Sequence, residues 1–428
     1  MNYIEAVKYI HSLLKFGIRP GLSGMDALLR LLGNPHKKLK YIHVAGTNGK
    51  GSTSTAISNV LTDAGYRVGL YTSPYVTDFL ERVQFCGKPV DKALFAVCVE
   101  KVKTAVESLE NDGVTITEFE ALTAAAFICY DELKCDVVVL EVGLGGRLDA
   151  TNIIDTPLVN VITSLSIDHS AILGNTIEEI AFEKCGTIKQ NGNVVCSFGQ
   201  PDGALRVIER TAKERNNSLT IPFESDVEIL KNDVFGTEFS YKNKQYYVKM
   251  AGEHQVKNMT CVIEACNILS EIFEISEDNI RNGINKTVLP ARVEVLSKKP
   301  LVILDGGHNA DGAKAFYDAV SSELANKDRI IVVAGMMADK EVEESLRNLL
   351  SKTDVLLCVT PNNPRAMPAG ELAQIGFKYA KKVFSVEKVT EALKIALAGA
   401  TGNSAVFVVG SLYLAGEVRE QLIELIEN

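Results

Sequence analysis

Short apolar runs alternate with helix-like segments along most of this chain, and this alternation restricts the possible fold more than any other feature. In the first half the strand-like runs are KYIHVAG, RVGLYTSP, CDVVVLEVG and PLVNVITSLSIDH. Strands that alternate with helices in this way form mostly parallel sheets covered by helices. The sequence therefore predicts an α/β fold built on a mostly parallel sheet.

Each of these predicted strands ends in glycine or polar residues. A glycine-rich loop follows the first, Ser73 follows the second, Glu141 closes the third, and Asp168 and His169 end the fourth. Ligands of open parallel sheets bind beyond the carboxyl ends of the strands. We therefore expect one ligand site at this edge of the sheet.

The glycine-rich loop lies in the stretch HVAGTNGKGS and carries a lysine and a hydroxyl. Its residues are Gly46, Thr47, Asn48, Gly49, Lys50, Gly51 and Ser52. Glycine N–H groups can bind phosphoryl oxygens, Lys50 can reach terminal phosphates, and Ser52 can hold Mg²⁺. The strict Walker pattern is broken, because Val44 replaces its first glycine and Gly51 separates Lys50 from Ser52. These departures weaken a generic kinase or GTPase interpretation, and a purely structural glycine turn is the alternative.

The length of 428 residues exceeds what one core usually supports, so we expect two domains. The alternation restarts after VLPARVEVLSKKP, which we interpret as a linker, with LVILDGG, RIIVVAGMM, DVLLCVTP, KVFSV and AVFVVGSLYL. This pattern predicts a P-loop-type domain at residues 1–297 and a smaller, doubly wound, Rossmann-like domain at 298–428. Polar-interleaved segments between residues 223 and 250 predict antiparallel strands appended to the main sheet.

Composition limits the partners. A net charge of −9 and a pI near 5.4 argue against a surface that neutralises nucleic-acid phosphates. The nine cysteines form no CxxC pair, the N-terminus lacks a signal-peptide pattern, and no apolar run reaches the ~18 residues of a membrane span. We therefore expect a cytoplasmic protein, and we expect a monomer because no coiled-coil repeat demands self-association.

The loop GTNGKGS resembles the phosphate loop of the folylpolyglutamate synthase and dihydrofolate synthase family, within the wider Mur ligase group. Further blocks resemble that family in the same order: LYTSPYVTDFLERV, TEFEALTAAAF, VVVLEVGLGGRLDATNII, SIDHSAILGNTIEEIAFEKCGTIK, PARVEV, DGGHNADG, GMMADK and GSLYLAGEVR. Together they extend from about residue 41 to residue 419.

The resemblance implies an ATP-dependent ligase that adds L-glutamate to dihydropteroate, to reduced folates, or to both, through an acyl phosphate. Its cofactors would be ATP and Mg²⁺, with two metal ions. Folylpolyglutamate synthase activity alone and a related Mur-type amino-acid ligase are alternatives within the group. An alternative of another class is a nucleotide-dependent binding module without ligase chemistry.

The resemblance also implies a set of metal ligands. They are Ser52, Ser73, Glu141, His169 and Lys184, the lysine being commonly carbamylated in this group. From the residues alone, Ser73 could cap a turn, His169 could be a hydrogen-bonded strand-end histidine, and Lys184 could be a helix-surface lysine.

Nucleotide and folate residues follow from the same resemblance. Lys50, Lys184, Arg292 and His308 would be catalytic, Arg292 and His308 on the phosphate side, while Asp305 would contact the ribose and Asn258 the adenine. Phe119 would stack on a pterin, and Asp149 would accept its N–H groups. From pattern alone, Asn258 could be a polar helix face, Phe119 core packing and Asp149 a turn residue.

Overall fold

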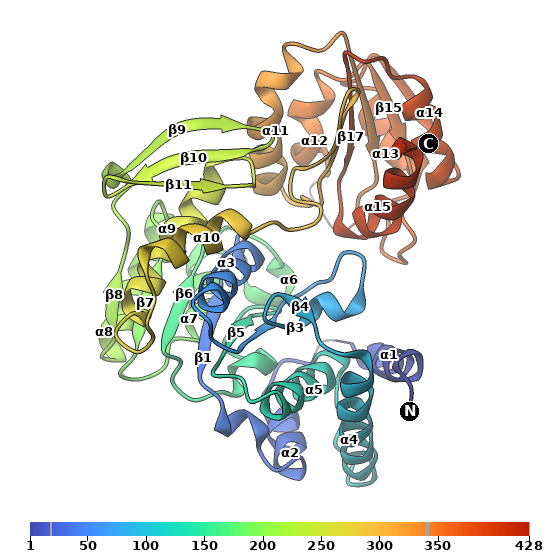
Figure 1. Ribbon diagram of the computed structural model, residues 1–428. Helices are drawn as coiled ribbons and strands as arrows, with labels where there is room; N and C mark the ends of the chain where they lie inside the picture. Colours follow the sequence, from blue (N-terminus) through green and yellow to red (C-terminus); the bar gives the residue numbers. More distant parts are fainter. Residues whose placement is uncertain (18, 339–341, 428) are drawn as a thin grey trace. The chain divides into compact units, whose positions relative to one another are not determined.

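The computed structural model describes residues 1–17, 19–338 and 342–427 (Figure 1). It divides into two compact units, which we describe separately. Unit 1 comprises Met1–Val227 and Lys257–Thr287, and unit 2 comprises Glu228–Val256 and Val288–Asn428.

An eight-stranded sheet forms the centre of unit 1, in the order β4-β3-β2-β5-β1-β6-β7-β8. Its strands are β1 (Tyr41–Ala45), β2 (Val68–Tyr71), β3 (Val83–Phe85), β4 (Lys88–Pro89), β5 (Val137–Glu141), β6 (Val159–Ile162), β7 (Asn193–Cys196) and β8 (Ser218–Thr220). Strands β2, β5, β1 and β6 are parallel neighbours. The predicted parallel sheet is confirmed, and its four expected strands lie side by side.

Helices pack around this sheet. Those of unit 1 are α1 (Tyr3–Ser12), α2 (Ser23–Leu31), α3 (Lys50–Asp63), α4 (Lys92–Asn111), α5 (Glu118–Glu132), α6 (Ser170–Leu173), α7 (Ile177–Cys185), α8 (Asp202–Glu214) and α10 (Glu277–Lys286). Helix α9 (Glu253–Leu269) begins in unit 2 and ends in unit 1. Every residue of β1 and β5 is buried, as expected for strands covered on both faces.

Unit 2 contains two sheets. A six-stranded sheet has the order β12-β13-β17-β14-β15-β16, and a three-stranded sheet has the order β11-β10-β9. The strands are β9 (Val227–Asp233), β10 (Gly236–Tyr241), β11 (Lys244–Val248), β12 (Glu294–Lys298), β13 (Leu301–Leu304), β14 (Arg329–Ala334), β15 (Val355–Cys358), β16 (Lys382–Ser385) and β17 (Ser404–Val409). The helices are α11 (Ala310–Leu324), α12 (Val342–Leu350), α13 (Ala369–Gly376), α14 (Val389–Ala398) and α15 (Leu412–Glu427).

The Rossmann-like expectation for the C-terminal strands is confirmed, since β13, β17, β14, β15 and β16 are parallel neighbours. The antiparallel strands expected near residues 223–250 are also present, as a separate sheet. Of the family-like block GMMADK, Asp339 and Lys340 lie outside the described residues.

Two expectations about strands are wrong in detail. Residues 294–298, interpreted as part of a linker, form β12, which pairs antiparallel with β13 at the sheet edge. An edge strand tolerates the lysine and the neighbouring Pro300 that suggested a linker. Strand β6 stops at Ile162, well before Asp168, because the carbonyl of Ser164 turns to accept the N–H groups of Thr47 and Asn48.

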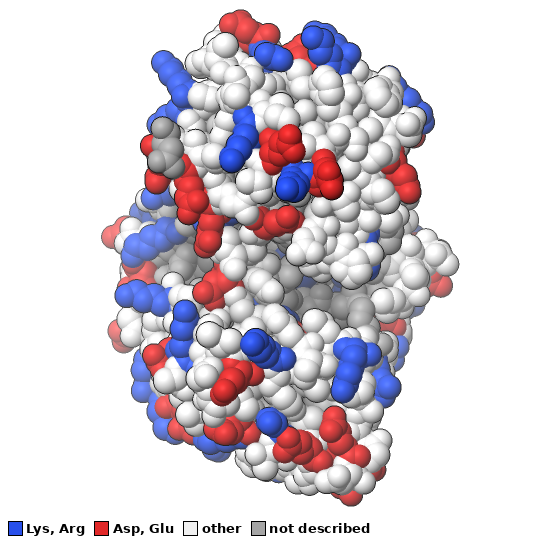
Figure 2. All heavy atoms as spheres, turned by 90° about the vertical axis from the view of Figure 1, so that its right-hand side faces the viewer, with Lys and Arg blue, Asp and Glu red and all other residues white. Residues whose placement is uncertain are grey.

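Charged side chains are mixed over the face drawn in Figure 2, where Lys and Arg lie among Asp and Glu. This mixture agrees with the modest net charge of −9. Across the described ranges, no helix combines the length and apolar character that a membrane crossing requires.

Candidate functional site

The strand ends of unit 1 bring Ser73 and Glu141 together. Glu141 ends β5 beside Val44 of β1, and its neighbour Leu140 lies beside Tyr71 of β2. The backbone N–H of Ser73 donates a hydrogen bond of 3.1 Å to a carboxylate oxygen of Glu141. The carboxylate is buried. The edge thus presents a carboxylate and a hydroxyl-bearing residue next to the phosphate loop.

The phosphate loop joins β1 to α3. Its backbone is held by Ser164, whose carbonyl accepts the N–H groups of Thr47 and Asn48 at 2.9 and 3.3 Å. Lys50 opens α3, and its ammonium donates to the carbonyl of Thr47 at 3.1 Å. Ser52 is buried in the first turn of the same helix. A helix N-terminus preceded by a glycine loop, with a lysine folded over it, suits an anion.

Asn258 packs against this loop. Gly49 has a φ of 88°, and a Cβ atom there would lie 2.2 Å from Oδ1 of Asn258. The left-handed backbone and this close approach both require glycine. Asn258 is buried on helix α9, with its side chain directed at the loop.

Lys184 reaches the loop from α7. Its Nζ donates a hydrogen bond of 2.8 Å to the carbonyl of Gly46, and the residue is only 5% exposed. The pKa of Lys184 is lowered to about 7, mainly by burial and also by the nearby charge of Lys50, whereas Asp168 and Asp149 act in the opposite direction. Lys184 is therefore not a helix-surface lysine.

His169 follows β6 beside Asp168. Its backbone N–H donates to Asp168 at 2.8 Å, and its Nε2 lies 3.9 Å from a carboxylate oxygen of the same residue. The His169 side chain is 45% exposed. The imidazole is thus accessible, beyond the end of β6 and next to the carboxylate that acts on Lys184.

Glu141, Ser73 and Ser52 have side chains of the kind that bind Mg²⁺. Among residues 1–17, 19–338 and 342–427, no group of three or more His, Cys, Asp and Glu side chains could hold a metal ion. Mg²⁺ does not need such a cage, because it keeps several waters and binds through one or two carboxylates together with substrate phosphates. Glu141, Ser73 and Ser52 offer the hard oxygen donors that this arrangement uses.

Phe119 lies in the first turn of α5, over the loop that follows β5. A Cβ atom on Gly143 would lie 2.5 Å from the Phe119 ring, so that glycine lets the ring approach. The centroid of the ring is 5.9 Å from that of Tyr71 and 5.7 Å from the guanidinium of Arg82. Phe119 is only partly buried, so one part of an aromatic side chain remains accessible.

Asp149 sits at the far end of the same loop, as the N-cap of the short helix η4 (Ala150–Ile153). It accepts the N–H of Leu144 at 2.9 Å, the N–H of Thr151 at 2.9 Å and the Thr151 hydroxyl at 2.5 Å. Burial raises the pKa of Asp149, although these hydrogen bonds act to lower it. The turn role expected as an alternative is therefore real, and it fixes the carboxylate.

Arg292, Asp305 and His308 belong to unit 2, where Arg292 lies just before β12 and the other two follow β13. Asp305 accepts the N–H groups of Val293 and Gly307 at 2.9 and 2.8 Å, and His308 Nδ1 lies 3.2 Å from the carbonyl oxygen of Gly306. Burial raises the pKa of the Asp305 carboxyl, and Arg292 opposes that shift.

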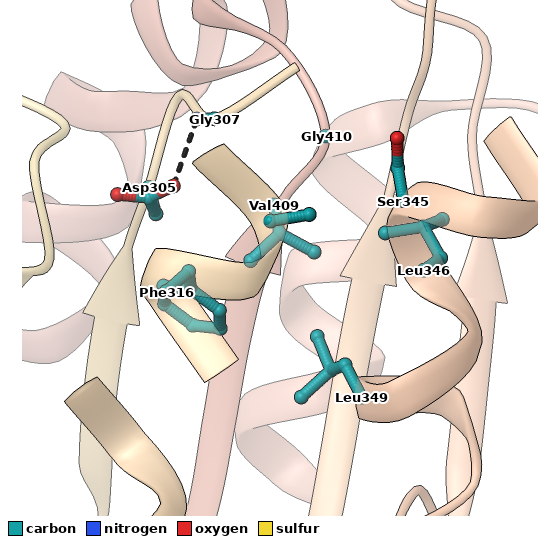
Figure 3. A pocket seen from close by; sticks show the side chains of 9 residues that line it. Asp305, Gly307, Phe316, Ser345, Leu346, Leu349, Val409 and Gly410 are labelled. Atoms are coloured by element: carbon teal, nitrogen blue, oxygen red, sulfur yellow. Dashed lines mark hydrogen bonds between the residues drawn. The ribbon is translucent and has the colours of Figure 1, made fainter. Parts of the chain in front are cut away.

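A small cavity lies beside Asp305, at the ends of β13 and β17 (Figure 3). It is lined by Asp305, Gly307, Ala313, Phe316, Ser345, Leu346, Leu349, Val409 and Gly410.

Sequence reasoning missed Arg82. Its guanidinium forms a buried ion pair of 2.7 Å with Glu118 and lies 5.7 Å from the ring centroids of both Phe79 and Phe119. Arg82 falls within the block LYTSPYVTDFLERV, yet no spacing in that block singles it out.

A phosphate loop on a parallel sheet, followed by a Rossmann-like sheet, defines a class of nucleotide-dependent ligases, and two domain families agree with it. The Mur ligase middle domain matches residues 44–266, and the Mur ligase glutamate ligase domain matches residues 291–412. The dihydrofolate synthase/folylpolyglutamate synthase of Bacillus subtilis is 37% identical over 98% of this chain and 99% of that protein. The chain belongs to the folylpolyglutamate synthase/dihydrofolate synthase family, and it is an ATP-dependent ligase.

Solved structures are similar over nearly the whole chain. E. coli FolC in complex with DHPP and ADP has a TM-score of 0.86 and 29% identity, covering 100% of this chain and 99% of that one. Mycobacterium tuberculosis folylpolyglutamate synthase complexed with ADP and AMPPCP has a TM-score of 0.88 and 28% identity, covering 98% and 99%. The resemblance stated from the sequence blocks is confirmed.

Proposed function

We propose that this enzyme joins L-glutamate to dihydropteroate and to reduced folates through an acyl phosphate, with ATP as the phosphoryl donor. One observation carries the proposal: the buried ammonium of Lys184 bonds to the phosphate loop that also carries Lys50. The cation of Lys50 suits the oxygens of a nucleotide triphosphate tail, and Lys184 lies at the same loop. The names of the B. subtilis relative and the E. coli structure with DHPP and ADP support the acceptor and the nucleotide.

The chemistry requires an activated acid, because hydroxide is a poor leaving group. A carboxylate oxygen of the acceptor attacks the γ-phosphorus of ATP, and the bond to ADP breaks. The amine of glutamate then attacks the acyl carbon, loses a proton and expels inorganic phosphate. Lys50 and the loop N–H groups of residues 46–52 would hold the phosphates in line and stabilise the charge that develops on them.

Mg²⁺ would be held by Ser52, Ser73, Glu141, His169 and Lys184, with two ions in all. When bound, it supplies positive charge that neutralises phosphate oxygens. Lys184 would serve after carbamylation: its neutral amine attacks CO₂, forms a C–N bond and releases a proton. The pKa of Lys184, lowered to about 7, supports this step because much of the amine is neutral at physiological pH.

The acceptor would bind at the loop after β5. Phe119 would stack on the pterin ring, and the Asp149 carboxylate would accept its N–H groups. Asn258 would contact adenine, Asp305 the ribose, and Arg292 and His308 the phosphates. In this assignment residues 1–297 carry the folate site and most of the ATP site, and residues 298–428 carry the glutamate side and the nucleotide contacts of Asp305 and His308.

The test is ADP release with a series of acceptors. Purified enzyme receives ATP, Mg²⁺ and L-glutamate with dihydropteroate, a reduced folate or a UDP-linked muramyl precursor. The proposal predicts turnover with both pteroate-type acids. Turnover of reduced folates alone would leave only folylpolyglutamate synthase activity, turnover of the muramyl precursor alone would indicate a different Mur-type ligase, and ATP binding without any turnover would favour a binding module.

A cytoplasmic location and a monomeric state remain predictions. Light scattering coupled to size-exclusion chromatography checks the second, since a monomer has a mass of 46.5 kDa.

A further inference from the structure

Three buried side chains of unit 1 form a hydrogen-bonded chain beneath the loop after β5. His43, in the middle of β1, is fully buried, and its Nε2 lies 2.9 Å from the hydroxyl of Thr151. That hydroxyl lies 2.5 Å from Oδ1 of Asp149. The strand that leads into the phosphate loop is therefore linked, through one threonine, to the carboxylate proposed to bind the pterin.

The protons available on the three side chains limit the direction in which these hydrogen bonds can run. Thr151 has one hydroxyl proton, which it can give either to Asp149 or to His43. If Asp149 is ionised, Thr151 donates to it and accepts from a protonated Nε2 of His43. If Asp149 is protonated, the bonds reverse, and His43 must carry its ring proton on Nδ1.

The surroundings of Nδ1 of His43 decide between these two hydrogen-bond arrangements. Within the described part of the chain, Nδ1 of His43 is buried and has no hydrogen-bond partner. An orphaned N–H in the interior loses a full hydrogen bond to water, and unpaired donors are rarer in folded proteins than under-satisfied acceptors. The first arrangement is therefore favoured: His43 donates to Thr151, and Thr151 donates to an ionised Asp149.

We infer that His43 is a positioning residue for the acceptor site, which acts through Thr151 to hold Asp149 ionised and oriented for the N–H groups of a pterin. This inference rests on the proposed function, since Asp149 is taken to bind the pterin. An ionised carboxylate can accept two N–H donors side by side, whereas a protonated one loses part of that capacity.

Other charges around the chain are compatible with this direction. Burial, together with the charge of Lys189, lowers the pKa of His43 to about 3, so the imidazole is neutral and has a single N–H to place. Asp149 interacts electrostatically with Lys184, whose pKa it raises, and with the buried hydroxyl of Tyr71.

The experiment compares Thr151→Val, which removes the hydroxyl at nearly constant shape, with Thr151→Ser, which keeps it. We expect T151V to raise the KM for dihydropteroate about tenfold and to change the KM for ATP less than about twofold, because one charge-assisted hydrogen bond is lost. We expect T151S to stay close to wild type. Thr211→Val is the matched control, since Thr211 is a buried threonine of α8 whose hydroxyl bonds within its own helix turn.

A second readout does not depend on turnover. In protein labelled with ¹⁵N-histidine, chemical shifts distinguish a protonated from a bare ring nitrogen, and the His43→Gln variant assigns the His43 signals. We expect a protonated Nε2 and a bare Nδ1. This measurement judges the hydrogen-bonded chain even if T151V does not fold.

The outcomes separate the inference from the function on which it rests. A protonated Nδ1, or a T151V variant whose dihydropteroate KM is unchanged or rises together with that for ATP, would overturn the role of His43. A wild-type enzyme that turns over no pteroate-type acid would instead overturn the proposed function, and with it the pterin as the ligand of Asp149.

Discussion

The ammonium of Lys184 donates a hydrogen bond of 2.8 Å to the carbonyl of Gly46, a residue 138 positions earlier in the chain. This contact ties helix α7 to the first residue of the phosphate loop. Because Lys184 is almost fully buried beside Lys50, its charge is destabilising until an anion or a modification compensates it. The site is therefore prepared for phosphate, and the ligand-free protein is less stable as a result.

Replacing Lys184 by methionine should stabilise the ligand-free protein and abolish ligase activity. The folded-state pKa is about 7, against an ordinary value of 10.5, so the unfolded chain binds more protons between these values. Wild-type stability should thus rise with pH in this window, so the excess of the K184M unfolding free energy over that of wild type, its stability advantage, should shrink. We expect an advantage on the order of 4 kcal/mol at pH 7 that narrows by about 2 kcal/mol at pH 9.

Urea unfolding in CO₂-free buffer at both pH values measures this difference, because carbamylation would change the charge of Lys184. Lys189→Met is a control, since Lys189 is also partly buried but belongs to none of the proposed phosphate contacts. An advantage of K184M that grows with pH would contradict the buried ammonium.

Alanine at Gly49 should strongly weaken nucleotide binding. Gly65→Ala is the matched control, because Gly65 has a nearly identical φ of 91° but a Cβ atom there would meet nothing within 4 Å, whereas at Gly49 it would lie 2.2 Å from Asn258. Both variants should lose about 1–2 kcal/mol through left-handed strain. Only G49A should also raise the dissociation constant of ADP, by about a hundredfold or more, because it must displace Asn258 from the loop. Isothermal titration calorimetry with ADP measures the two dissociation constants. Equal affinities for ADP in the two variants would contradict nucleotide binding at this loop.

Alanine at Gly143 should weaken binding of the acceptor without affecting binding of ATP. The added Cβ would lie 2.5 Å from the ring of Phe119, so the ring must move. We expect the KM for dihydropteroate to rise about tenfold in G143A. In a Phe119→Ala background the same change should add little, because the obstacle has gone. Steady-state kinetics of the two single variants and the double variant measure this coupling, and full additivity would mean that G143A does not act through the Phe119 ring.

His43 should make the fold sensitive to acid. Its folded-state pKa is about 3, below the ordinary 6.5, so the unfolded chain binds the extra proton first. Stability that is present above pH 6.5 should be lost as the pH falls toward 3, by an amount on the order of 4 kcal/mol. We therefore expect wild type to lose more unfolding free energy than His43→Gln between pH 7 and pH 4.5. A constant difference would mean that His43 is already charged in the fold.

Apolar continuity made part of this fold predictable. Strands β1 and β5 are mostly apolar runs that end at the phosphate loop and at Glu141, and the sequence places both correctly. Strand β8 has only three residues, and β12 contains charged and polar residues, so neither length nor periodicity distinguished them from loops.

The site was predictable in its residues but not in its contacts. Motif blocks nominated Lys184, Phe119 and Asp149, yet nothing in their spacing shows that Lys184 meets Gly46 or that Phe119 lies over Gly143. Such contacts depend on how strands and helices pack in three dimensions. The same limit hid Arg82 and the link from His43 to Asp149.

The proposed mechanism depends above all on transfer of the γ-phosphoryl group of ATP to the acceptor carboxylate. Dihydropteroate labelled with ¹⁸O in that carboxylate tests this transfer directly, when the enzyme turns over with ATP, Mg²⁺ and L-glutamate. An acyl phosphate predicts one ¹⁸O atom in each inorganic phosphate released, together with ADP. Unlabelled phosphate, or ¹⁸O recovered in AMP, would contradict it.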